Sequence, residues 1–191
     1  MSDISINLEK GQKIELTKTT PGLTKVQIGG GWDVNKNATG SYDVDISAYL
    51  IDVNEKIGSG DNIVYFNHKK NPNGSVELDK DNLTGEGEGD DEKIFINFDT
   101  IPADRAAIYF AINIYKAQEK RQNFGVIQNA YIRVLNMADN QQLMRFDLSE
   151  DYSTGTGVLA GKLYRHGTEW KFQAIGEVVN GDIATIAKRW Q

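Results

Sequence analysis

Apolar and polar residues alternate with a period of two along most of this chain. The pattern is clearest at residues 42–50, 93–98 and 108–114, and it continues in shorter runs as far as residue 174. Successive side chains of a strand point to opposite faces of a sheet, so each run predicts a strand with one buried face. About ten short strands separated by turns are typical of an all-β sandwich, and we expect that architecture here.

Short clusters rich in glycine, proline, asparagine and aspartate predict the turns between these strands. They lie at residues 21–22, 29–31, 71–74, 139–140 and 166–167. Residues 63–66 are apolar on both faces and predict a central strand that is buried on both sides. Residues 183–190 follow helical spacing after Asp182, a suitable N-cap. A short C-terminal helix that packs on the sheet is therefore expected.

Length and composition exclude several classes of protein. The chain has 191 residues without an internal repeat or linker, so one domain spanning residues 1–191 is expected. The formal net charge is −6, and no basic stripe exists to neutralise phosphates, which argues against a nucleic-acid partner. The absence of cysteine excludes disulfides and thiol chemistry. Neither a signal peptide nor a membrane span is apparent, so we expect a cytoplasmic protein with no direct membrane insertion.

A dense acidic block interrupts the strand pattern at residues 81–92. Six of its twelve residues are carboxylates, three are glycines and none is basic. So much like charge repels itself unless the segment is a solvated loop or folds around a cation. The glycines let the backbone turn sharply and direct successive oxygens inward, and calcium takes six to eight oxygen ligands. We interpret the block as a calcium site, and its surplus of carboxylates indicates two ions.

The block does not match an EF-hand, because Glu86 stands where that loop requires glycine. Further ligands should therefore come from a neighbouring strand. Strand alternation places Asp43 and Asp45 on one face, about 7 Å apart, with apolar residues on the opposite face. Asp33 follows Trp32 at the end of the glycine cluster. These three aspartates are predicted to complete the ion's shell.

Enzymatic motifs are weak in this sequence. The chain has two histidines, His68 and His166, and lacks both a zinc-protease motif and a nucleophile elbow. The main hypothesis is a non-enzymatic calcium-binding module. The alternative is a metal-dependent enzyme, for instance a phosphoester hydrolase that uses the same carboxylates, with His68 and Arg121 as the available base and cation. A third hypothesis, calcium as a staple in an adhesion sandwich, is disfavoured by the missing secretion signal.

Several segments resemble motifs of the TerD family, the tellurium-resistance and general-stress proteins of bacteria. They are Gly-Trp-Asp at residues 31–33, Tyr-Asp-Val-Asp-Ile-Ser-Ala at residues 42–48, the 81–92 block, and residues 122–125, 146–151 and 163–172. The chain departs from the family pattern at residues 34–40 and 152–162. The resemblance implies a β-sandwich that binds calcium, usually two ions, through the acidic block and the earlier aspartates.

The resemblance also implies a cytosolic stress-operon protein whose partners are related paralogues or a membrane-associated complex. Motif and spacing together give one set of predicted metal ligands. They are Asp33, Asp43, Asp45, Asp81, Asn82, Thr84, Gly85, Glu86, Glu88, Asp90, Asp91 and Glu92.

Overall fold

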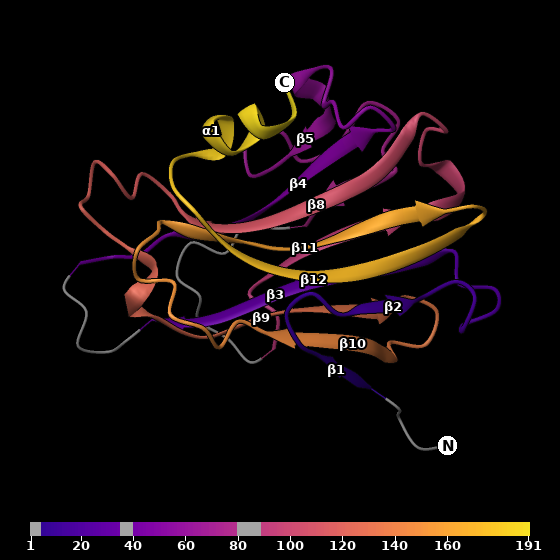
Figure 1. The fold of residues 1–191 in the computed structure, drawn as a ribbon, viewed down its shortest axis with the longest axis horizontal. Coiled ribbons are helices and arrows are strands. Elements are labelled where there is room, and N and C mark those ends of the chain that lie inside the picture. The colour runs from indigo at the N-terminus through magenta and orange to yellow at the C-terminus, as the bar shows by residue number, and fades with distance from the viewer. Residues whose placement is uncertain (1–4, 35–39, 80–88) are drawn as a thin grey trace.

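The computed structural model describes residues 5–34, 40–79 and 89–191, and these residues form two stacked six-stranded sheets (Figure 1). In spatial order, sheet A contains β1 (Ile6–Leu8), β10 (Gln142–Asp147), β9 (Ile127–Asn136), β3 (Lys25–Val34), β7 (Glu92–Asn97) and β6 (Val76–Leu78). Sheet B contains β2 (Lys13–Glu15), β12 (Glu169–Val179), β11 (Gly157–His166), β8 (Arg105–Ile114), β4 (Val44–Asp52) and β5 (Ile63–Val64). The predicted β-sandwich is confirmed.

Alternate residues of the strands build the core between the two sheets. Sheet A contributes Ile28, Ile94 and Ile132, and sheet B contributes Ile46 and Phe110, each fully buried. Neighbouring strands are antiparallel except for β1, which pairs in parallel with β10. Within the described residues, no helix has the length and apolar character needed to cross a membrane.

The expected C-terminal helix is also confirmed. Helix α1 (Ile183–Ala187) begins after Asp182, whose side chain accepts a hydrogen bond of 2.8 Å from the backbone N–H of Thr185. The 3₁₀ turn η4 (Lys188–Trp190) follows it directly. The ring of Trp190 lies 5.2 Å from that of Tyr49 and 4.7 Å from that of Tyr109, between centroids. The C-terminal segment thereby covers the outer face of sheet B (Figure 1).

Three further 3₁₀ turns lie in the connections between strands. They are η1 (Gly60–Asn62), η2 (Phe98–Thr100) and η3 (Phe124–Val126). Each begins after a residue whose side chain accepts a backbone hydrogen bond, namely Ser59, Asn97 and Asn123. Such local capping makes these residues favourable at the start of a turn.

Two sequence predictions about local structure are wrong. Residues 63–66 were expected to form a central strand, but β5 is two residues long and lies at the edge of sheet B. The glycine cluster at residues 29–31 was expected to form a turn, but it lies inside β3. The glycines serve close packing there, since a Cβ on Gly29 would collide with the carboxylate of Asp90, and one on Gly31 with the ring of Tyr131.

This close packing predicts a cost for even one added methyl group at Gly31. The ring of Tyr131 is held by its hydrogen bond to Asp90 and by the guanidinium of Arg145, 3.7 Å from its centroid, so it cannot move away freely. We expect Gly31→Ala to lower the free energy of unfolding by about 1–3 kcal/mol, measured by denaturant titration.

The matched control is Gly60→Ala. A Cβ at Gly60 has no other atom within 4 Å, so this variant should stay within about 0.5 kcal/mol of the wild type. Equal stability of the two variants would contradict the packing role of Gly31.

Candidate functional site

The acids at the described end of the block are Asp90, Asp91 and Glu92, and β7 begins at Glu92. Three predicted ligands outside the block, Asp33, Asp43 and Asp45, are also described. The other six predicted ligands lie outside the described residues: Asp81, Asn82, Thr84, Gly85, Glu86 and Glu88. The three consecutive acids make three different sets of contacts.

Asp90 is held by a network of side chains from β3 and β9. Its Oδ1 accepts hydrogen bonds from Arg133 Nε at 2.6 Å and from the Tyr131 hydroxyl at 3.0 Å. Its Oδ2 accepts one from Gln27 Nε2 at 2.8 Å, and the whole side chain is buried. Strand alternation places Gln27, Tyr131 and Arg133 on the outer face of sheet A, over Gly29. Both oxygens of Asp90 are therefore engaged within the protein.

Asp91 ties the start of β7 to β3. Its backbone N–H donates to the carbonyl of Gly30 at 2.9 Å, and its Oδ2 accepts from the backbone N–H of Trp32 at 2.7 Å. Burial is the largest cause that raises the pKa of the Asp91 carboxyl. The Trp32 hydrogen bond opposes the shift and the negative charges of Asp33 and Asp90 add to it, so that the pKa is about 6. Ionised Asp91 is thus in an unfavourable environment near neutral pH.

The side chain of Glu92, in β7 of sheet A, reaches β4 of sheet B. Its residue is 1% exposed, and its Oε2 accepts a hydrogen bond of 2.6 Å from the backbone N–H of Ile46 in β4. Glu92 alternates with Ile94 and Ile96, both of which face the core, so its carboxylate enters the sandwich at the end of β7. A buried carboxylate of this kind requires strong donors or a cation.

The aspartates outside the block lie on β3 and β4. Asp33 is exposed on β3, and its Oδ2 accepts from Asn129 Nδ2 at 2.7 Å. Asp45 is 3% exposed on β4 and lies opposite Asn113 of β8. Asp43 precedes β4, and its backbone carbonyl accepts from the N–H of Tyr115 at 2.7 Å. Asp45 therefore occupies a buried strand position, directly before the residue that Glu92 contacts.

The side chains of Asp91 and Glu92 at the start of β7 offer carboxylate oxygens in a partly dehydrated environment, and such oxygens suit a hard divalent cation. Across residues 5–34, 40–79 and 89–191, however, no three Asp, Glu or His side chains gather closely enough to form a metal-binding group by themselves.

Sequence reasoning missed the network around Asp90. Arg133, Tyr131 and Gln27 are separated from Asp90 by 41 to 63 positions, and only strand pairing brings them together. The available signal was the alternation in β9, which places Tyr131 and Arg133 on the same face. The partner strand could not be known without the sheet order.

Comparison with known proteins identifies the family. A model described as the TerD domain matches residues 4–190. The chain belongs to the TerD family. This membership confirms the resemblance of the motifs and groups the chain with stress-response and tellurium-resistance proteins.

Several relatives align with almost the full length of this chain. General stress protein 16U of Bacillus subtilis (strain 168) is 47% identical over 185 residues, which are 96% of this chain and 96% of that protein. Tellurium resistance protein TerD of Alcaligenes sp. is 39% identical and covers 98% of this chain and 97% of its own length. A solved homologue of telluride resistance protein (TerD) from Streptomyces coelicolor A3(2) has a TM-score of 0.71 at 20% identity, over 87% of this chain and 96% of that chain. That structure shares the fold.

The raised pKa of Asp91 predicts a specific dependence of stability on pH in excess chelator. The folded protein holds this proton up to about pH 6, whereas the unfolded chain releases it near the ordinary value of 3.8. The stabilising contribution is full below about pH 4 and is lost as pH rises through 6. We expect Asp91→Asn, which stays neutral, to lack this loss when denaturant unfolding is measured from pH 4 to pH 7. Identical pH profiles of the variant and the wild type would show that Asp91 titrates normally.

Proposed function

We propose that this TerD-family protein is a calcium-binding, non-enzymatic stress-response module of the cytoplasm. The observation that carries the proposal is the burial of consecutive acids at the end of the acidic block. Glu92 is buried and Asp91 is half-buried, and their side chains reach different strands, β4 and β3 respectively. Carboxylates gathered in this way repel each other, and a divalent cation offsets both the repulsion and the loss of hydration.

The proposed ligands divide into two groups. Asp33, Asp43, Asp45, Asp91 and Glu92 supply the carboxylates described above, and the earlier part of the block, residues 81–88, supplies the remainder. Asp90 has a different role in the proposal. Because Arg133, Tyr131 and Gln27 occupy its oxygens, we assign it to fixing the end of the block against sheet A rather than to binding the ion. The number of acids supports two ions.

The proposed mechanism links the ion to the stability of the sandwich. Asp91 connects the start of β7 to β3 within sheet A, and Glu92 connects it to β4 in sheet B. A cation that neutralises these two carboxylates would stabilise the contacts of the start of β7 with β3 and with β4. Calcium would thereby control the folding of the segment around the start of β7, or the binding of a partner such as a related paralogue or a membrane-associated complex.

Calcium should stabilise the folded protein by mass action. An ion that binds only the native state at a hundredfold excess over its Kd adds about 2.7 kcal/mol to the free energy of unfolding. For a chain of this size, that corresponds to a rise of about 5–10 °C in melting temperature relative to excess chelator. Magnesium at the same concentration should give a smaller rise, because it demands a rigid octahedral shell and dehydrates reluctantly. Superimposable melting curves in calcium and in chelator would refute the proposal.

The role of β4 can be tested with an isosteric change. Asp45→Asn keeps the shape of the side chain and removes its charge, so the sandwich should still form. We expect calcium affinity by isothermal titration to fall at least tenfold, equivalent to about 1.4 kcal/mol. The matched control is Asp99→Asn, because Asp99 lies exposed in η2 and should leave the affinity unchanged. If both variants bind like the wild type, Asp45 is not a ligand.

A further inference from the structure

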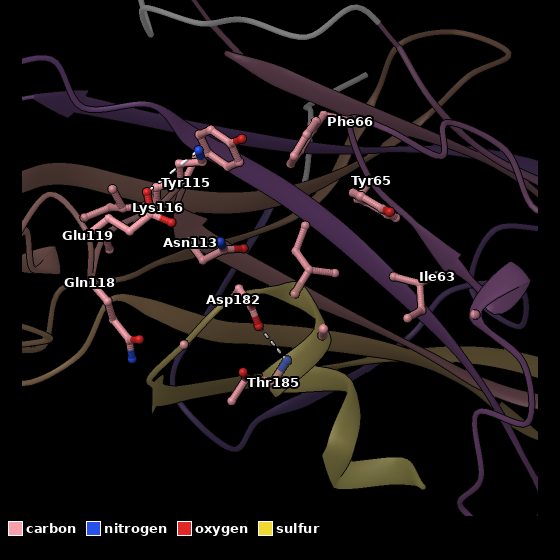
Figure 2. Close-up of a pocket in the computed structure, with 16 residues that line it drawn as sticks. Ile63, Tyr65, Phe66, Asn113, Tyr115, Lys116, Gln118, Glu119, Asp182 and Thr185 are labelled. Atoms are coloured by element: carbon pink, nitrogen blue, oxygen red, sulfur yellow. Dashed lines mark hydrogen bonds and ion pairs between the residues drawn. The ribbon is translucent and has the colours of Figure 1, made fainter.

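A second site is suggested by a cavity of about 480 Å³ beside the start of α1 (Figure 2). It is lined by residues 113–119 at and after the end of β8, by residues 181–185, and by Gly60, Ile63, Tyr65 and Phe66 around β5. Its volume falls in the range of small-molecule sites, roughly 300–1,000 Å³. None of the predicted metal ligands lines it, so it is separate from the calcium proposal.

Asn113 supplies a polar group for which the described residues offer no hydrogen-bond partner. The residue is 3% exposed, and its buried Oδ1 accepts no hydrogen bond from the described part of the chain. Figure 2 shows its amide directed into the space between Asp182 and Ile63. Buried polar groups are nearly always hydrogen-bonded, because an unpaired one loses its water without compensation. A ligand that brings an N–H donor would satisfy this oxygen.

Three charged side chains line the cavity near Asn113, namely Asp182, Glu119 and Lys116. Asp182 lines the cavity and caps α1, and its hydrogen bonds to Thr185 hold the pKa of its carboxyl below the ordinary value. The positive charge of Lys116 at the rim is balanced by Glu119, with 3.7 Å between Nζ and Oε2. Among the lining residues, Asp182 is therefore the carboxylate that Lys116 does not balance, and the ammonium groups of Lys116 and Lys120 lie 5.5 Å and 5.8 Å from the centroid of the Tyr115 ring.

Aromatic rings form the apolar wall of the cavity. The Phe66 ring meets the Tyr65 and Tyr115 rings edge to face, with centroids 5.3 Å and 5.2 Å apart. Ile63 and Ile183 extend this wall. Aromatic faces attract ammonium groups, as those of Lys116 and Lys120 over the Tyr115 ring illustrate, and the rings also bury the apolar part of a ligand.

We propose that this cavity binds a small organic amine. Its protonated amino group would donate to Asn113 and lie near Asp182, and its apolar body would pack against Tyr65, Phe66 and Tyr115. This chemistry combines the acceptor of Asn113, the carboxylate of Asp182 and the aromatic wall, which a neutral or anionic ligand would use less well.

The test is a titration of the full-length protein with 2-phenylethylamine, followed by ¹⁵N NMR. Its matched probes are 2-phenylethanol, which is neutral, and 3-phenylpropionate, which is anionic. We expect the amine to shift the signals of residues 113–119 and 181–185 with a Kd below about 1 mM, and the other two probes to bind at least tenfold more weakly. Absence of binding, equal binding of all three probes, or shifts confined to other regions would overturn the proposal.

Two variants locate the binding within the cavity. Asn113→Leu removes the acceptor at similar volume and should weaken amine binding at least tenfold. Ala184→Trp fills the mouth from an exposed position of α1 and should abolish binding even if Asn113→Leu fails to fold. The control is Ala103→Trp at an exposed loop position outside the cavity, which should bind like the wild type. Unchanged affinity in Ala184→Trp would overturn the assignment of the cavity.

Discussion

Burial of carboxylates at the start of β7 is the constraint on which the rest of this structure depends. Glu92 is 1% exposed, and its acceptance of the Ile46 N–H fastens an inner strand of sheet A to β4 of sheet B. Asp91 accepts the N–H of Trp32 in β3. Backbone donors have little freedom to move, so these two acids fix three strands relative to one another. The acids are therefore structural elements as well as candidate ligands.

The outer faces of the two sheets differ in polarity. The outer face of sheet A carries the polar network of Asp90 and Arg133 over the open backbone of Gly29. The outer face of sheet B is apolar around Tyr49 and is covered by the C-terminal segment with Trp190. A charged network on sheet A remains in contact with solvent at Arg133, whereas sheet B needs a cover to bury its aromatic residues.

Sequence periodicity predicted the sandwich and the capped C-terminal helix, because both depend on local alternation and on one side chain, that of Asp182. It failed where tertiary packing decides the outcome. The glycines at residues 29–31 look like a turn in isolation, yet they lie in β3, where the side chains of Asp90, just before β7, and of Tyr131 in β9 lie across the backbone. Residues 63–66 are apolar on both faces, yet β5 is a two-residue edge strand, because Tyr65 and His68 exchange backbone hydrogen bonds of 3.0 Å and 2.9 Å in a tight turn that ends it.

The candidate site shows the same division between local and long-range information. The acidic block and the pair Asp43 and Asp45 are visible as composition and spacing, since carboxylates at alternate positions are a local pattern. Asn113 gives no such signal, because it is one polar residue in the apolar run of β8. Its environment arises only when β4 places Asp45 on one side and β11 places Gly157 on the other. A side chain at Gly157 would collide with Asn113, so the glycine keeps the asparagine in its strand position. Asp45, Asn113 and Gly157 are neighbours across three strands although the first and last are 112 positions apart. Their contacts therefore form only when the sheet folds.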